Sequence, residues 1–417
     1  MKLLIDKWLL LIVFILIMIG LVSVYSSTSV ISPDEIQKGI EKGVNVSPFG
    51  LLKKQLFTFF IGLFALFLAY KIRLTHLKIL TIPLLLISLI ALLLVFTSLG
   101  VSAGGARRWI RAWPSVFQPS ELVKLSIVVF VAWFLSSRYF NRDSVKSFLI
   151  PIAVMVVFQV ILIKQRDFGA VMSLGILTVT MLFIGGVRLK YIGLLSLVAI
   201  PFIVKLALEP YRLKRITAFL DPWRDPLGSG FQLVQSFIAL GSGGVTGVGL
   251  GEGKQKLSYL PEIHTDFIFA LIGEELGFIG TSVVIVLFIL FMMRGLWIAK
   301  ESHDTFSAYL AYGITFMISY QALINFLVVT GMIPTKGLPL PFISYGGSSL
   351  FINMIAVGIL LNVAKINKQH RMLNLQAKSI YHNEPVTMYI PSQGSNVAED
   401  KGIKPLYCLN RKTNLVV

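Results

Sequence analysis

The sequence has little acidic charge and a single cysteine. Only 20 of its 417 residues are Asp or Glu, and charged residues make up 14% of the chain, against about 25% in a soluble domain. Hydrophobic residues reach 55%. The lone Cys408 excludes a disulfide within the chain and a cysteine-based metal site. This composition indicates an integral membrane protein and excludes the disordered and disulfide-rich secreted classes.

Lys and Arg exceed Asp and Glu by 18, a balance that would point to nucleic acid in a soluble protein. In a membrane protein, however, Lys and Arg gather in cytoplasmic loops and orient the chain. No basic segment is interleaved with aromatic residues. We therefore predict membrane lipid surroundings and no nucleic-acid partner.

Ten segments come close to the roughly 20 apolar residues that a membrane-crossing helix needs. They lie at about 8–25, 55–70, 79–97, 119–136, 148–163, 168–187, 190–207, 267–293, 306–330 and 342–363. We predict an all-α integral membrane protein with about ten transmembrane helices. The first segment lacks a small-residue cleavage site, so we expect a retained helix and not a signal peptide.

The charge of the short loops predicts the orientation. With both termini in the cytoplasm, every inner loop is basic, which is the positive-inside pattern. The inner residues are Lys71, Arg73, Lys78, Arg138, Arg142, Lys146, Arg188, Lys190, Arg294, Lys300, Lys365, Lys368 and Arg371. Three outer arginines, Arg107, Arg108 and Arg111, break the rule, and an anionic ligand would explain them.

We expect a membrane domain at 1–365 and a flexible cytoplasmic tail at 366–417, which is polar and has no periodicity. A large outer loop at 208–266 separates the seventh span from the eighth, and loops of this length are usually functional. Its stretch Phe231–Leu240 is amphipathic enough to lie at the membrane interface or to re-enter the membrane.

The densest polar cluster lies where this loop meets the eighth span, at Tyr259–Phe267. Asp266 has three readings: a helix N-cap, a general base at the mouth of an outward cavity, or a metal ligand. A metal site would combine Glu262, His264 and Asp266, which alternate and share a face if the segment is extended.

Two further clusters carry polar groups close to the membrane. Glu121 and Lys124 are three residues apart at the start of the fourth span, so they can pair as a structural lock or face a polar cavity. The segment Ile333–Ser349 contains prolines and glycines that interrupt an apolar run, with Lys336 as an outward cation. Asn325 adds a polar group to the ninth span, and at least one of Glu274 and Glu275 in the eighth is expected to face the interior.

Several uncommon strings occur together in one order. They are Gly105-Ala-Arg-Arg-Trp-Ile110, Gln118-Pro-Ser-Glu121, Asp221-Pro222, Tyr259-Leu-Pro-Glu262, His264-Thr-Asp-Phe267, Gly273-Glu-Glu275 and Ser344-Tyr-Gly-Gly-Ser-Ser349. With these strings the chain resembles the SEDS family (shape, elongation, division and sporulation) over most of residues 8–365. The stretch Pro334–Pro341 is similar to the division branch. At Gln165–Gly169 the sequence departs from the family, because Arg166 stands where a turn-forming proline is usual.

The resemblance implies a peptidoglycan glycosyltransferase that polymerises lipid II in cell division, by inverting transfer with an isoprenyl diphosphate as leaving group. The essential aspartate of the family falls on Asp266, which we expect to be the catalytic base. The residues expected to bind substrate are Arg107, Arg108, Glu121, Lys124, His264, Lys336 and Ser344. A bound Mg²⁺ or Mn²⁺ is an alternative source of positive charge for the diphosphate; no other cofactor is expected.

The resemblance also implies partners and a place in the cell. These are lipid II as substrate, a class B penicillin-binding transpeptidase and other divisome proteins, at the septum of the cytoplasmic membrane. Two alternatives of other classes stay open: a flippase that carries lipid II across the membrane, and a non-catalytic divisome scaffold. The flippase fits less well because the charge gathers at the outer surface and not along a path through the membrane.

Overall fold

The computed structural model describes residues 5–28, 49–103, 106–112, 115–256 and 263–383. The chain divides into two compact units, Met1–Arg371 and Met372–Val417. The candidate site lies wholly within the first unit. The predicted motif residues Tyr259–Glu262 lie outside the described residues, as does Cys408.

Each of the ten predicted spans contains a helix. The helices are α1 (Lys7–Thr28), α3 (Gly50–Lys71), α5 (Thr81–Leu94), α6 (Pro119–Leu135), α7 (Val145–Lys164), α8 (Phe168–Ile184), α9 (Leu189–Ala207), α12 (Ile268–Lys300), α13 (Thr305–Val329) and α14 (Gly347–Asn383), and the short α4 (Leu74–Ile79) lies between α3 and α5. In the part of the chain that the structure describes, six of them, α1, α3, α7, α12, α13 and α14, are long and apolar enough to cross a membrane. The predicted helical membrane fold is confirmed.

The outer loop contains further short elements. They are α10 (Pro210–Leu220), the 3-10 turn η1 (Pro222–Arg224) and α11 (Phe231–Gly243). A small antiparallel sheet, which the sequence did not predict, lies between α5 and α6. Its strands β1 (Gly100–Ala103), β2 (Ala106–Ala112) and β3 (Ser115–Phe117) pair in chain order, with a bulge between Val101 and Ser102.

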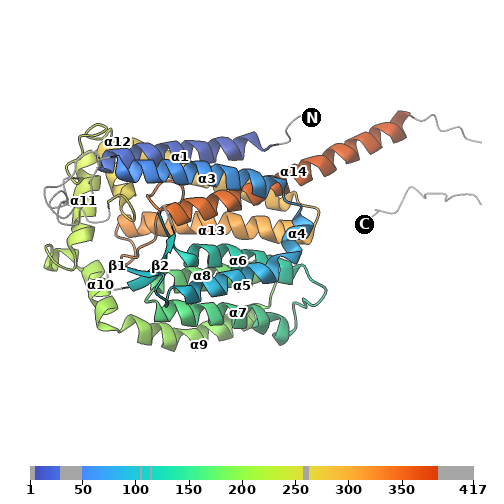
Figure 1. Cartoon of the computed structure of the whole chain (residues 1–417), viewed down its shortest axis with the longest axis horizontal. Coiled ribbons are helices and arrows are strands. Elements are labelled where there is room, and N and C mark those ends of the chain that lie inside the picture. The colour runs from blue at the N-terminus through green and yellow to red at the C-terminus, as the bar shows by residue number, and fades with distance from the viewer. Residues whose placement is uncertain (1–4, 29–48, 104–105, 113–114, 257–262, 384–417) are drawn as a thin grey trace, which may run out of the picture. The chain divides into compact units, whose positions relative to one another are not determined.

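The two ends of the helical bundle differ in content. Figure 1 shows β1, β2, α10 and α11 at one end and α4 at the other. Loops that were predicted to be cytoplasmic contact one another through ion pairs. These pairs are Lys78–Asp304 at 3.4 Å, Arg188–Asp143 at 2.5 Å and Arg294–Asp6 at 2.5 Å. The predicted outer loop and the sheet thus lie at one end of the bundle, and the predicted cytoplasmic loops lie at the other (Figure 1).

Helix α6 is the centre of the bundle. Nearly all of its 17 residues are buried, on every side of the helix, between α5, α8 and α13. Pro119 begins it, at a position where proline has no backbone N–H to lose. Close helix contacts elsewhere depend on glycine: a Cβ atom at Gly358 of α14 would lie 2.4 Å from the carbonyl oxygen of Leu66 in α3.

Helix α12 breaks at Gly277, where φ is +66° and the helical hydrogen bonds stop. The loop after α11, residues 244–256, forms hydrogen bonds with backbone groups of α12 at this break. We call it the Gly247 loop. The backbone N–H of Val248 donates to the carbonyl of Glu274 at 3.0 Å. A Cβ atom at Gly247 would lie 2.1 Å from the carbonyl oxygen of Glu275, so the close approach requires glycine there.

The side chains of Glu274 and Glu275 also hold this loop, and both are 2% exposed, which confirms the expected interior position. Glu274 accepts a hydrogen bond from the backbone N–H of Lys254 at 2.7 Å. Glu275 accepts one from the hydroxyl of Ser26 in α1 at 2.5 Å and pairs with Lys256 at 3.7 Å. The break in α12 is thus fixed by backbone bonds and by buried charge.

Candidate active site

Asp266 lies in a turn, residues 263–267, immediately before α12. The N-cap of α12 is Phe267, whose side chain makes no capping bond, so helix capping does not account for Asp266. The carboxylate is partly exposed. It lies against the irregular chain between α13 and α14, residues 330–346, which we call the Lys336 segment. A Cβ atom at Gly337 would lie 2.8 Å from Oδ2 of Asp266.

Helix α13 fixes the Lys336 segment through two amide side chains one turn apart. Asn325 donates to the backbone carbonyls of Asp266 at 2.8 Å and Leu338 at 2.9 Å. Gln321 donates to the carbonyl of Pro339 at 2.8 Å. Asn325 therefore links the backbone at Asp266 to the Lys336 segment.

Ser344 closes the other end of the segment. Its hydroxyl donates to the carbonyl of Thr265 at 2.6 Å and accepts from the N–H of Leu340 at 2.7 Å. The N–H of Tyr345 donates to the carbonyl of His264 at 2.8 Å, and the two rings pack edge to face. Ser344 and His264 therefore lie beside Asp266, and these hydrogen bonds position the turn. Their predicted contact with substrate stays a prediction.

The predicted pair of Glu121 and Lys124 is present at 2.8 Å, with both side chains almost fully buried. Lys124 also donates to Oε1 of Gln321 at 2.6 Å. The ion pair in α6 is thereby connected through Gln321 to Pro339. In this structure the pair acts as a support for the Lys336 segment.

Lys336 itself is partly buried, and burial lowers the pKa of its ammonium group below the ordinary 10.5. Lys336 is next in the chain to Gly337, which lies against Asp266. Its role as a cation that binds substrate stays a prediction.

The two predicted arginines of β2 differ in what they contact. Arg107 donates to the backbone carbonyls of Phe96, Thr97 and Gly100, and so ties the sheet to the end of α5. Arg108 donates to the carbonyl of Arg166 at 2.6 Å, in the turn between α7 and α8.

Arg166, where the family usually has proline, adopts φ = +60° and donates its N–H to the carbonyl of Ile163 at 2.9 Å. Proline is fixed near φ = −65° and has no N–H, so it cannot adopt this turn. The local shape therefore differs from one built on proline. The following Asp167 is buried and caps α8 by accepting from the N–H of Ala170 at 3.2 Å.

Several buried polar atoms near this site lack a hydrogen-bond partner in the described part of the chain. They are Gln55 Oε1, Arg108 Nε, Ser120 Oγ and Asn325 Oδ1. Buried polar atoms are nearly always satisfied by protein, water or ligand. Gln55 also donates to the carbonyl of Ser344 at 3.4 Å. The turn that bears Asp266 and the Lys336 segment thus lie among polar side chains.

The three-residue metal site stays a prediction, because Glu262 lies outside the described residues. His264 and Asp266 belong to a turn. Among the described residues no group of three His, Cys, Asp or Glu side chains could hold a metal ion.

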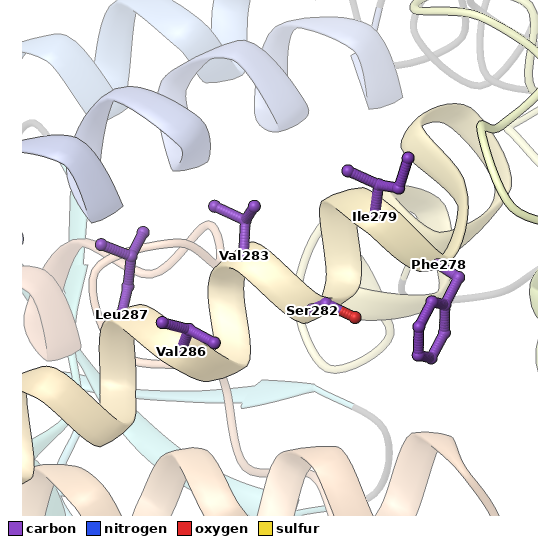
Figure 2. A pocket seen from close by; sticks show the side chains of 6 residues that line it. All are labelled: Phe278, Ile279, Ser282, Val283, Val286 and Leu287. Carbon is purple, nitrogen blue, oxygen red and sulfur yellow. The ribbon is translucent and has the colours of Figure 1, made fainter.

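A separate groove of about 360 Å³ lies along α12 beyond its break (Figure 2). It is lined by Phe278, Ile279, Ser282, Val283, Val286 and Leu287. The only polar side chain is Ser282, so the groove can hold an acyl chain or an apolar helix but cannot carry out proton transfer.

The sequence analysis did not single out Gln321, because no motif surrounds it. It also did not single out Arg212 and Arg215 of α10, because they lie in a loop of mixed charge. A polar residue at an interior position of an apolar span, as for Asn325, was the available signal for Gln321.

Comparison with known proteins places these residues in context. A family model described as "cell cycle protein", covering FtsW, RodA and SpoVE, matches residues 7–369. A probable peptidoglycan glycosyltransferase FtsW of Geobacter sp. is 43% identical over 86% of this chain and 96% of its own. Stage V sporulation protein E of Bacillus subtilis is 40% identical over 87% and 98%.

Two solved structures are also similar. One belongs to a peptidoglycan synthase complex that coordinates polymerization and crosslinking, with 28% identity, a TM-score of 0.70, and coverage of 88% of this chain and 99% of that one. The other is the rod shape determining protein RodA of Thermus thermophilus, with 26% identity, a TM-score of 0.62, and coverage of 87% and 97%.

Proposed function

Because the chain belongs to the FtsW, RodA and SpoVE family of cell cycle proteins, we propose that it is a peptidoglycan glycosyltransferase that polymerises lipid II during cell division. The names of relatives that are 43% identical over most of the chain support the activity. The observation that carries the proposal is Asp266, held by Asn325 against the segment that bears Lys336.

Asp266 is the general base of the proposed reaction. Its carboxylate takes the proton from the 4-hydroxyl of the acceptor sugar as that oxygen attacks the anomeric carbon of the donor. The new glycosidic bond forms as the bond to the diphosphate oxygen breaks, with inversion, and the electron pair leaves on the isoprenyl diphosphate. Such a base is typically worth about 10²–10⁴-fold.

The leaving diphosphate needs positive charge and no strong general acid. Lys336 supplies one ammonium group beside the carboxylate, and Arg108 adds a guanidinium near the α7–α8 turn. Glu121 and Lys124 act through Gln321 on the position of the Lys336 segment. Dependence on Mg²⁺ or Mn²⁺ is a separate proposal, tested by adding a chelator to the assay.

A class B penicillin-binding transpeptidase is the proposed partner, in the cytoplasmic membrane at the septum. A similar solved chain belongs to a synthase complex that couples polymerization to crosslinking. The exposed apolar side chains along the helices leave lateral surface for a membrane-spanning partner.

Polymerisation of labelled lipid II by the purified protein tests the function, with and without the cognate transpeptidase. We expect Asp266→Asn to lower glycan formation by about 10²–10⁴-fold. Asp225→Asn is the matched control, because Asp225 is another outer-loop carboxylate, held by Ser229 in its own turn, and should leave the rate unchanged.

Equal polymer from wild type and Asp266→Asn would overturn the assignment of the base. No polymer, combined with movement of lipid II across vesicle membranes, would favour the flippase. Neither activity, with normal growth of cells that carry Asp266→Asn, would favour the scaffold.

A further inference from the structure

Helix α10 turns two of its three basic residues toward the protein. Arg212 and Arg215 are three residues apart and partly buried, so they lie on one face of the helix. Lys214, on the same helix, is exposed. The inward face of an outer-loop helix is therefore cationic where an apolar face would be usual.

Arg215 contacts the Lys336 segment directly. Its Nη1 donates to the carbonyl of Thr335 at 3.3 Å. Thr335 precedes Lys336, and Gly337 lies against the carboxylate of Asp266. Since neighbouring Cα atoms are about 3.8 Å apart, the backbone from Thr335 to Gly337 spans at most about 7 Å. Arg215 thus contacts the same segment that bears Lys336 and lies against Asp266.

Arg212 contacts the start of α8. Its guanidinium lies over the ring of Phe168, 4.8 Å from the centroid, and pairs with Glu209 at 3.1 Å. The start of α8 and the Lys336 segment meet, because a Cβ atom at Gly169 would lie 3.6 Å from the side chain of Leu338. The two arginines of α10 therefore border a single region that also contains Lys336.

The chemistry of the arginine side chain suits a diphosphate. A planar guanidinium can contact two diphosphate oxygens at once, which an ammonium group cannot.

We propose that Arg215, assisted by Arg212, binds the diphosphate of the isoprenyl-linked donor and so makes α10 part of the substrate site. The proposal rests on the proposed function, and it assigns the leaving-group contact to a helix of the outer loop.

Binding of farnesyl diphosphate to the full-length protein in detergent tests this without catalysis, with farnesyl monophosphate as the reference ligand. We expect wild type to prefer the diphosphate and Arg215→Gln to bind it about ten- to a hundred-fold more weakly, because a charge-assisted bidentate contact is lost. Arg215→Lys should recover part of the affinity. Lys214→Gln removes the same charge from the exposed face and should bind as wild type does.

The outcomes separate the two proposals. Equal diphosphate affinity in wild type and Arg215→Gln overturns the inference even if the protein polymerises lipid II. Equal losses in Arg215→Gln and Lys214→Gln overturn it too, because the effect is then only net charge. Selective loss in Arg215→Gln supports it, including in a protein without polymerase activity, where only the proposed function fails. Unchanged monophosphate binding shows that Arg215→Gln is folded.

Discussion

Two irregular segments meet α12, one at its start and one at its break, and they are held in opposite ways. The Gly247 loop joins the break at Gly277 through backbone hydrogen bonds, glycine contacts and the buried charges of Glu274 and Glu275. The Lys336 segment joins the start mainly through the side chains of Asn325 and Ser344, with one backbone bond from Tyr345 to His264.

This difference suggests that the Gly247 loop mainly stabilises the fold and that the Lys336 segment mainly positions Asp266. Breaking backbone hydrogen bonds or buried ion pairs lowers the stability of the protein strongly, so substitutions in the Gly247 loop should lower the free energy of unfolding. Amide side chains that donate to backbone carbonyls next to a catalytic group contribute less to stability, yet a small displacement of such a group reduces the rate strongly. We expect stability effects at the first segment and rate effects at the second.

The largest stability loss is expected for Glu275→Gln, which leaves Lys256 buried without its ion-pair partner. Removing one member of a buried pair typically costs about 3–5 kcal/mol. Denaturant titration in mixed micelles measures it. The double variant Glu275→Leu with Lys256→Met should regain most of the loss, and a single variant as stable as wild type would contradict this view of the loop.

Gly277→Ala comes next. The residue has φ = +66°, and an added Cβ atom would lie 2.3 Å from the backbone nitrogen of Gly247. Strain and overpacking together predict a loss of about 2–4 kcal/mol. The control is Gly241→Ala in α11, where nothing lies within 4 Å, so alanine should be neutral or slightly stabilising. Equal thermal unfolding midpoints for both variants would show that the break in α12 does not require glycine at position 277.

Asn325→Leu should act mainly on the rate. It leaves the carbonyls of Asp266 and Leu338 without their donor, and we expect glycan formation to fall about 10–100-fold. Asn362→Leu is a matched control, because Asn362 is equally buried and also donates to two carbonyls, those of Ala69 and Ile72, at the other end of the bundle. An equal loss of glycan formation in both variants would contradict a specific effect of Asn325 on Asp266.

The smallest effect concerns pH. Burial lowers the pKa of Lys336 below 10.5, so the unfolded state binds more protons and stability rises as the pH increases from the folded pKa to 10.5. Polymerisation should fall over the same interval, because the ammonium charge is lost. Lys336→Arg should move this alkaline decline in rate to higher pH, and Lys336→Met should abolish the associated rise in stability. An unchanged profile in both variants would exclude the contribution of Lys336.

The features that could be predicted from the sequence are those that depend on residues close together in the chain. Long apolar runs predicted the helices, and the three-residue spacing predicted the pair of Glu121 and Lys124. The sequence did not predict partners that depend on the folded chain, such as Gln321 with Lys124 and Pro339. The bonds of Arg107 to carbonyls are of the same kind. The predicted substrate contacts of Arg107 and Glu121 remain untested.

The sheet between α5 and α6 was missed for a different reason. Its strands are short and contain charged residues, so neither alternation nor length distinguishes them from a loop. The turn at Arg166 shows the same limit, because its positive φ follows from its neighbours and not from arginine itself.

The burial of α6 on every side has a consequence for how the protein is made. This helix has 17 residues and carries two charged side chains that lie within the bundle. Charged groups raise the cost of entering lipid by about 2.5–3.5 kcal/mol each at a helix centre and by less near an end. A helix of this kind enters the membrane most readily alongside neighbours that already shield it. The pair that supports the Lys336 segment thus makes insertion of α6 during synthesis depend on α5 and on helices that follow it.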